Sequence, residues 1–262
     1  MLIYVKNRKI KVTYDGKTLK LPKKLEDDIN RNWKKEIIKT PELWNGDIFC
    51  VKNLVENDNE IILNCSKTNY AHYLYDERIG CPKEYGNYGL SAGMFFETSD
   101  EYYVIGKLSK TTSFPNGLSI QGGSVDKKDI MTDGTVDIEA TMRREAIEEI
   151  NFDIKNKNEV ENYEIKYISP ATEKIKTYEI ICKGKLKLNS NEVRKHFEKY
   201  YEYLKENNLE MEYEDIILLK KETALKELKK MSNPKRKYLL DIIEADSILD
   251  VERKRNETSN NI

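Results

Sequence analysis

The chain has 262 residues, which suits one large domain or a domain with a sizeable extension. Hydrophobic residues make up 39% and charged residues 35% of the chain, so a core can form beneath a highly charged surface. Lys and Arg number 45 and Asp and Glu 46, a net charge of -1 with the two signs interspersed. Because nucleic-acid-binding proteins usually present a basic face, a nucleic-acid partner is not expected.

The cysteines and histidines give no sign of a zinc site. Cys50, Cys65, Cys81 and Cys182 form no Cys-x-x-Cys pair, and the chain has only two histidines. No apolar segment follows Met1, and no apolar run has the length of a membrane span. We therefore expect a soluble, cytoplasmic protein without a membrane partner.

The first ninety residues predict a small α+β unit. Alternating apolar residues on either side of Asp15-Gly16 predict a β-hairpin within residues 1–20. Helical spacing predicts a helix over residues 22–38, which Pro41 follows. Residues 48–55 and 60–66 are predicted to be a strand pair, and residues 69–89 are rich in Tyr, Gly and Pro without a clear period.

From residue 90 onward, strands and helices alternate in a different pattern. Predicted strands cover residues 90–98, 102–108, 118–122, 163–169, 174–187 and 215–219. Predicted helices cover residues 137–150, 192–206, 222–231 and 234–248. The last dozen residues are polar, and we expect a frayed tail.

The segment from Arg144 to Phe152 contains the most informative motif. Glu145, Glu148 and Glu149 lie at positions i, i+3 and i+4, which share one face of a helix. Carboxylates crowded in this way repel one another unless a cation lies between them, and their oxygens suit Mg²⁺ or Mn²⁺. Alone, the triplet is also typical of a solvated acidic helix face.

The context of this helix resembles the Nudix hydrolases, whose signature is G-x5-E-x7-R-E-U-x-E-E-x-G-U with U bulky and apolar. Gly123 matches the first glycine, Arg144-Glu145 and Glu148-Glu149 match the core, and Phe152 matches the last apolar position. The resemblance implies an α/β fold, the Nudix α/β/α sandwich with a mixed sheet, over residues 90–250. Residues 1–89 would be an α+β N-terminal extension and residues 251–262 a polar tail.

The sequence departs from the signature in three places. The stretch between Gly123 and Arg144 is longer, so residues 126–135 are interpreted as an insertion and predicted to be a mobile loop at the mouth of the site. Counted back from Arg144, the isolated signature glutamate falls on Val136. Asn151 replaces the second glycine, which Asn tolerates at helix ends. The candidate substitutes for the missing glutamate are Asp126, Asp137 and Glu139.

The resemblance implies metal-dependent hydrolysis of a phosphoanhydride bond, by attack of water on phosphorus, in a nucleoside diphosphate linked to another moiety. Glu145, Glu148, Glu149 and the Gly123 carbonyl would ligate Mg²⁺ or Mn²⁺, and Arg144 would orient the glutamates. The partner would be a small-molecule nucleotide diphosphate derivative, and a homodimer is left open. The general base would be an acid on a later loop, with Glu212 and Glu214 as candidates.

The extension has a fainter resemblance to segments that precede the Nudix fold in UDP-sugar-cleaving members, in residues 41–46 and 68–70. Trp44, Tyr73 and Tyr85 are candidates to bind substrate, although such aromatics also serve as core and rim. Two alternatives remain open. One is a catalytically silent Nudix-fold module that binds nucleotides or regulates, and the other is isomerase chemistry of the isopentenyl diphosphate isomerase kind, which needs a pocket cysteine.

Overall fold

The computed structural model describes residues 1–41, 43–112 and 114–259, with the backbone alone for residues 250–259. The N-terminal part contains β1 (Ile3–Tyr4), β2 (Lys9–Thr18), α1 (Lys23–Lys39), β3 (Asp47–Glu56), β4 (Glu60–Asn69), α2 (Tyr70–Arg78) and the 3-10 turn η1 (Lys83–Tyr85). The central part contains β5 (Gly89–Glu97), β6 (Tyr102–Leu108), β7 (Leu118–Ser119), β8 (Gln121–Ser124), the 3-10 turn η2 (Lys127–Asp129) and α3 (Ile138–Ile150). The last part contains β9 (Val160–Ser169), β10 (Thr177–Leu186), α4 (Ser190–Glu206), β11 (Tyr213–Lys220), α5 (Ala224–Lys230) and α6 (Lys237–Ser259).

The strands of the described residues form one mixed sheet. Its main path runs β1-β9-β10-β5-β3-β4-β2, while β6 joins β5, β7 and β11, and β8 joins β5. The β10–β5 and β2–β4 pairs are parallel and the other pairs are antiparallel. This confirms the predicted α/β class with a mixed sheet, and strands of the N-terminal extension belong to the same sheet.

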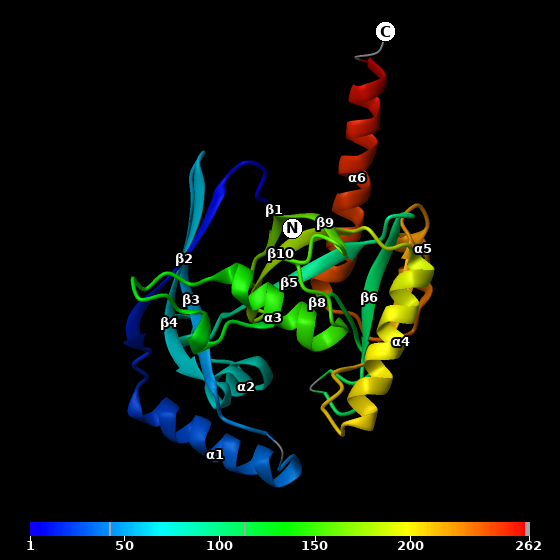
Figure 1. Ribbon diagram of the computed structural model, residues 1–262. Coiled ribbons are helices and arrows are strands. Elements are labelled where there is room, and N and C mark those ends of the chain that lie inside the picture. Colours follow the sequence, from blue (N-terminus) through cyan, green and yellow to red (C-terminus); the bar gives the residue numbers. More distant parts are fainter. Residues whose placement is uncertain (42, 113, 260–262) are drawn as a thin grey trace.

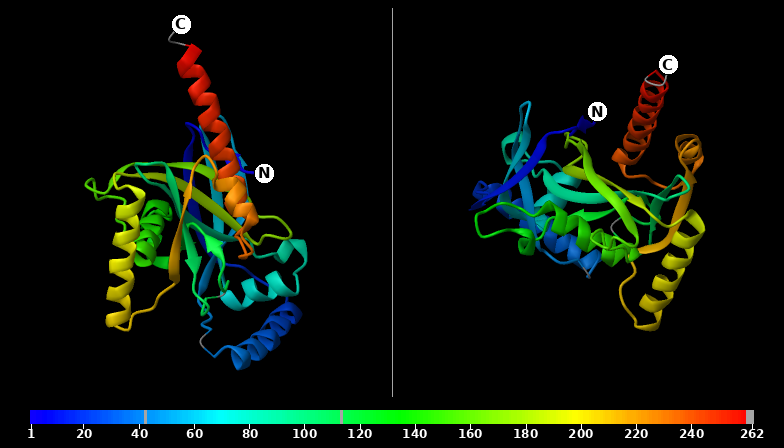
Figure 2. Two further views of the ribbon diagram at one scale, coloured as in Figure 1. Left: turned by 90° about the vertical axis from the view of Figure 1, so that its right-hand side faces the viewer. Right: turned by 45° about the horizontal axis from the view of Figure 1, so that its top comes forward.

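Helices cover both faces of this sheet, and a core lies on each side (Figures 1 and 2). Side chains of β5 alternate between the two cores: Met94 and Phe96 lie on the side of α3, and Phe95 lies on the side of α6. The first core also takes Ala146 from α3 and Val193 from α4. The second takes Leu228, Leu239, Ile242 and Ile243 from α5 and α6. The layers are therefore helix, sheet and helix, as predicted.

The predicted N-terminal hairpin is wrong. β1 pairs with β9 through Ile3↔Ile168, and β2 runs parallel to β4 instead of turning back on β1. Gly16 lies inside β2 with a φ of 72°, where the pairing with β4 is irregular. The glycine therefore supplies the left-handed backbone conformation that an irregularity within one strand requires. A hairpin turn requires the same residue type, so the sequence pattern does not distinguish the two.

Two further segments differ from the sequence prediction. Residues 70–78 form α2, whose first turn is capped by the Asn69 side chain accepting the His72 N–H at 3.0 Å. Helix α6 continues to Ser259 instead of ending at residue 248, because no Gly or Pro interrupts it. Its C-terminal half projects from the body (Figure 1). No helix in the part of the chain that the structure describes has the length and apolarity to span a bilayer.

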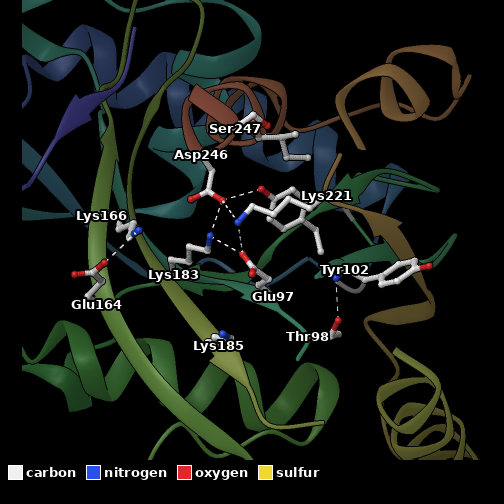
Figure 3. A network of polar contacts seen from close by, with 12 residues as sticks. Glu97, Thr98, Tyr102, Glu164, Lys166, Lys183, Lys185, Lys221, Asp246 and Ser247 are labelled. Atoms are coloured by element: carbon white, nitrogen blue, oxygen red, sulfur yellow. Dashed lines mark hydrogen bonds and ion pairs between the residues drawn. The ribbon is translucent and has the colours of Figure 1, made fainter. Parts of the chain in front are cut away.

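A cluster of buried charges holds α6 against the sheet (Figure 3). Asp246 of α6 lies 2.5 Å from the Lys183 Nζ and accepts a 2.7 Å hydrogen bond from the Tyr103 hydroxyl. Glu97 pairs with the same lysine at 2.7 Å and with Lys221 at 3.0 Å. Because each carboxylate faces an ammonium group, the charges are compensated where water is scarce.

Candidate active site

Helix α3 fixes the positions of the glutamate side chains. The Asp137 side chain accepts the Ala140 N–H at 3.0 Å and caps the first turn. At the other end Asn151 adopts the left-handed conformation with a φ of 59°, as expected from its replacement of glycine. The apolar face of the helix is buried in the core through Met142, Ala146 and Ile150.

A cleft of about 670 Å³ opens beside this helix. One wall consists of Gly122, Gly123, Glu145 and Glu149, and residues 212–213 add to it. The facing walls come from α2 of the N-terminal extension, from residues 174–177 before and at the start of β10, and from residues 235–238 at the start of α6. The cleft therefore has a cluster of acidic groups beside α3, whereas the charged side chains of the facing walls are lysines and arginines with Glu77 of α2.

Glu145 and Glu149 both line the cleft, one helical turn apart. Glu149 Oε2 accepts the Gly122 N–H at 2.8 Å, whereas its Oε1 is buried without a hydrogen-bond partner in the described residues. The Glu145 carboxyl lies so close to Gly123 that a Cβ there would meet the carboxyl carbon at 2.6 Å. Residue 123 must therefore be glycine for the carboxylate to lie against the strand.

Arg144 holds the acidic face together. Its guanidinium pairs with the Glu145 carboxylate and lies 3.7 Å from Glu148, so the predicted i, i+4 pair is present. The Glu148 side chain is 59% exposed and does not line the cleft. The structure thus brings Glu145 and Glu149 together in the cleft and leaves Glu148 at its outer edge.

Asp129 occupies the position of the isolated signature glutamate, for which the sequence predicts three other acids. It is buried, its Oδ2 accepts a 2.8 Å hydrogen bond from the Thr141 hydroxyl, and the same oxygen lies 3.2 Å from Arg144 Nη2. Five residues separate Gly123 from Asp129, so the signature spacing is intact there. The extra residues lie between Asp129 and α3. For this reason, the signature spacing counted back from Arg144 ends on Val136 and not on Asp129.

The three candidate substitutes have other partners. Asp126 caps η2, accepting the Lys128 N–H at 3.1 Å, and Asp137 caps α3. Glu139 is ion-paired with Lys155 and accepts a 3.0 Å hydrogen bond from Tyr163. None of the three reaches Arg144 among the contacts of the described residues, so the sequence interpretation missed the acid that does.

The insertion at residues 126–135 does not lie at the mouth of the cleft, and the prediction that it does is wrong. None of its residues, all of which the structure describes, lines the cleft. The Gly134 carbonyl accepts the Tyr14 N–H of β2 at 2.8 Å, and the Val12 carbonyl accepts the Val136 N–H at 3.0 Å. These bonds hold the loop against the N-terminal strands, away from the substrate side.

Only one of the two base candidates faces the cleft. Glu212 lines it, whereas Glu214 is ion-paired with Lys107 at 2.5 Å and does not. Burial, together with the nearby Glu145 and Glu210, raises the pKa of Glu212 to about 7. A carboxyl that exchanges a proton near neutral pH suits a general base.

Three further acids that line the cleft also have raised pKa values. Burial raises the pKa of Glu145, and it raises that of Glu149 well above the usual value, with Glu212 and Glu145 adding to the effect. Burial also raises the pKa of Glu179 on β10 to about 8. Nothing in the sequence pattern singles out Glu179, which lies within a strand predicted only from its apolar neighbours. A cation in the cleft would oppose every one of these shifts.

The donors at this end of the cleft fit a hard divalent cation. They are carboxylate oxygens, and the unpartnered Glu149 Oε1 is a buried acceptor that lacks a positive partner. As they stand, no three His, Cys, Asp or Glu side chains of the described chain converge closely enough to hold a metal ion. Glu145 is ion-paired with Arg144 and Glu148 lies at the outer edge, so Glu149 is the ligand candidate that the fold already positions.

Of the three substrate candidates in the extension, Tyr73 lines the cleft. Its ring stacks on Tyr70 with centroids 6.0 Å apart, and its hydroxyl lies 3.2 Å from the Thr177 hydroxyl. The Trp44 side chain is 79% exposed, and the carbonyl of Tyr85 lies 3.0 Å from the His72 ring; neither residue lines the cleft. The extension therefore reaches the cleft through α2.

The chain is similar to several solved Nudix hydrolases. The protein from Alicyclobacillus acidocaldarius aligns with 61% of this chain and 91% of its own at 10% identity, with a TM-score of 0.40. The proteins from Nitrosomonas europaea and Clostridium perfringens each align with 62% of this chain, covering 88% and 98% of theirs. Their identities are 10% and 11% and their TM-scores 0.37 and 0.35.

No family model and no curated protein matches the chain.

Proposed function

We propose that this chain is a Nudix-type hydrolase that uses Mg²⁺ or Mn²⁺ to cleave a phosphoanhydride bond in a nucleoside diphosphate linked to another moiety. The observation that carries the proposal is the buried, unpartnered Oε1 of Glu149 in a cleft that Glu145 and Glu212 also line. Acids held together at a cost in free energy are typical of sites where charge is used in catalysis.

The residues that line the cleft then have roles that their positions support. Glu149, Glu145 and the Gly123 carbonyl would hold the cation, Glu148 would join them only after turning inward from its exposed position, and Mg²⁺ or Mn²⁺ would supply charge neutralisation and Lewis acidity. Arg144 orients Glu145 and Glu148 through its ion pairs. Glu212 would accept the proton of the attacking water, whose oxygen forms the new bond to phosphorus as the bridging oxygen leaves with the other product.

Two other functions are weighed against this one. A silent nucleotide-binding module would not need Glu145, Glu149 and Glu212 to be crowded in one cleft, which favours catalysis. Isomerase chemistry needs a cysteine in the pocket, and no cysteine is among the described residues that line the cleft. The hydrolase therefore accounts for more of the site than either alternative does.

The test is a substrate screen with Mg²⁺ in ¹⁸O-labelled water. Nucleotide sugars, dinucleoside polyphosphates, ADP-ribose and nucleoside triphosphates are compared, and label in a phosphate product reports attack at phosphorus. We expect Mg²⁺-dependent turnover that falls about tenfold to a thousandfold in Glu149→Gln, on the scale of removing a group that stabilises transition-state charge. Nucleotide binding without turnover in the wild type would support the silent module instead.

A further inference from the structure

The segment that leads into α6 is fixed to the sheet beside the cleft. The Pro234 carbonyl accepts the Leu118 N–H at 2.8 Å, and the Leu118 carbonyl accepts the Arg236 N–H at 3.0 Å. The Asn233 side chain donates to the Asn116 carbonyl at 3.1 Å. Residues 235–238 are therefore held in place as a wall of the cleft, which they line.

The Arg236 side chain packs on an aromatic ring and has no carboxylate partner among the described residues. Its guanidinium carbon lies 4.7 Å from the centre of the Phe114 ring, a distance typical of a cation–π contact. No ion pair joins it to an acid in the described part of the chain, whereas Arg144 and Arg143 are both paired with acids. Its hydrogen-bond donors therefore remain available to a ligand in the cleft.

Arg236 lies between the acidic end of the cleft and the aromatic wall from the extension. Its charge opposes the upward pKa shifts of Glu212 and Glu179 on one side. On the other side, its charge also opposes the upward pKa shifts of Tyr70 and Tyr73 of α2. Such effects require proximity, so one guanidinium serves both halves of the cleft.

Two lysines that line the cleft already have partners within the chain. The Lys176 Nζ is ion-paired with the buried Asp76 at 3.1 Å, and the Lys235 Nζ donates to the Met231 and Asn233 carbonyls at 2.5 and 2.8 Å. A planar guanidinium that packs on an aromatic ring also loses less freedom on binding than a flexible lysine, and it can donate two parallel bonds to one phosphate.

We propose that Arg236 determines specificity by binding the phosphate farther from Glu145 and Glu149, so that the cleft selects linked diphosphates over single phosphate groups. The inference rests on the proposed function, because that function puts a phosphoanhydride at the acidic end. A ligand with one phosphate reaches either the acidic end or Arg236. A diphosphate reaches both, and its second charge is neutralised by the guanidinium.

The first experiment measures binding of inorganic pyrophosphate, which lacks the nucleoside of the proposed substrates, and release of phosphate is checked to be absent. Pyrophosphate and inorganic phosphate are titrated calorimetrically into the full chain with Mg²⁺, because without a cation the acidic end would repel both anions. We expect pyrophosphate to bind more tightly than phosphate, and Arg236→Gln to weaken pyrophosphate binding roughly tenfold to a hundredfold, the scale of a charge-assisted hydrogen bond. Arg236→Lys keeps the charge but lacks the planar guanidinium. Its affinity for pyrophosphate should lie between those of the wild type and Arg236→Gln.

The matched control is Arg143→Gln, because Arg143 is an arginine that forms an ion pair with Asp153 and does not line the cleft. It should bind pyrophosphate like the wild type. Thermal unfolding of each variant shows that the fold is intact, and Arg236→Lys serves if Arg236→Gln does not fold. No pyrophosphate binding with Mg²⁺, unchanged binding in Arg236→Gln, or an equal loss in Arg143→Gln would each overturn the proposal.

The second experiment separates this inference from the proposed function. With any substrate found in the screen, Arg236→Gln should raise KM more than it lowers kcat, whereas Glu149→Gln should lower kcat. Absence of Mg²⁺-dependent turnover in the wild type would contradict the proposed function, and the pyrophosphate titration would still test Arg236. A fall in kcat alone, with KM unchanged, would contradict the assigned role of Arg236.

Discussion

Asp129 Oδ2 lies 3.2 Å from Arg144 Nη2, and the two side chains are only 4% and 18% exposed. Arg144 is therefore held between Asp129 on one side and Glu145 on the other. An arginine fixed from two sides keeps Glu145 in one orientation, and the Thr141 hydroxyl in turn orients Asp129. Asp129, immediately before the extra residues, thus supplies the second partner of the arginine.

We predict that Asp129→Asn lowers turnover about tenfold and the free energy of unfolding by about 1 to 3 kcal/mol, the cost of weakening a buried charged hydrogen bond. Turnover of the substrate from the screen and urea unfolding measure the two effects. The control is Asp126→Asn, which weakens only the cap of a short turn. A larger loss of turnover in Asp126→Asn would show that Asp126 fills the signature position instead.

We predict that Glu212→Gln lowers kcat by roughly 10²- to 10⁴-fold, the usual contribution of a general base. Because burial raises the pKa of Glu212 to about 7, its active, unprotonated form is lost as pH falls below that value. In the wild type, kcat should therefore fall with decreasing pH, and a bound cation would move this fall to lower pH.

The matched control for Glu212 is Glu214→Gln, since Glu214 is two residues away but ion-paired with Lys107 outside the cleft. It should keep both the rate and the acidic fall of the pH profile. If Glu214→Gln removes that fall and Glu212→Gln keeps it, the base is Glu214.

We predict that Tyr73→Ala raises KM about tenfold or more, because aromatic stacking on a base contributes roughly 1 to 3 kcal/mol. The ring lines the cleft and packs on Tyr70, so it offers a flat surface to a base or sugar. Trp44→Ala is the control, because this side chain is 79% exposed and lies outside the cleft lining. Equal KM values for wild type and Tyr73→Ala would exclude Tyr73 as a substrate contact.

We predict that Asp246→Asn lowers the free energy of unfolding at pH 7 by about 3 kcal/mol, as expected for removing one partner of a buried charge cluster. Burial opposes the charged form of Asp246, but Lys183 and the Tyr103 hydroxyl outweigh it and lower its pKa. A lowered pKa stabilises the fold above the unfolded value of about 3.9, and this contribution is lost as pH falls through the folded value.

The difference between wild type and Asp246→Asn should therefore shrink below about pH 4. Chemical unfolding at several pH values measures this. The control is Glu164→Gln, whose partner Lys166 lies 3.2 Å away at the surface and whose loss should cost less than about 1 kcal/mol. A constant difference between pH 7 and pH 3 would contradict the assigned titration of Asp246.

The local signals in the sequence were enough to predict the centre of the fold. Helix α3 was expected at residues 137–150 and lies at Ile138–Ile150, because its cap, apolar face and end residue all indicate the same limits. Gly123 and Arg144 were assigned from the motif, and their contacts with Glu145 agree with that assignment. Periodicity and caps act within a few turns, so they can be read without the rest of the molecule.

The features that the sequence did not reveal depend on contacts between distant segments. Tyr14 bonds the insertion at Gly134, which explains why the loop lies away from the cleft. Helix α2 has aromatic residues on several sides, so its periodicity is blurred. In the sequence, Arg236 is one of the residues at the start of a predicted helix. Its position in the cleft depends on the hydrogen bond to the distant Leu118, which the sequence does not reveal.

The first hydrophobic core contains Val12 and Leu63 from the extension together with Ala146 and Ile150 from α3, all less than 3% exposed. Two segments that share one core lose their packing together when either one opens. The backbone amides of β4 and α3 should then exchange with solvent only through the same global opening. Residues 1–89 would thus behave as part of the same cooperative folding unit as α3 and not as an appended module.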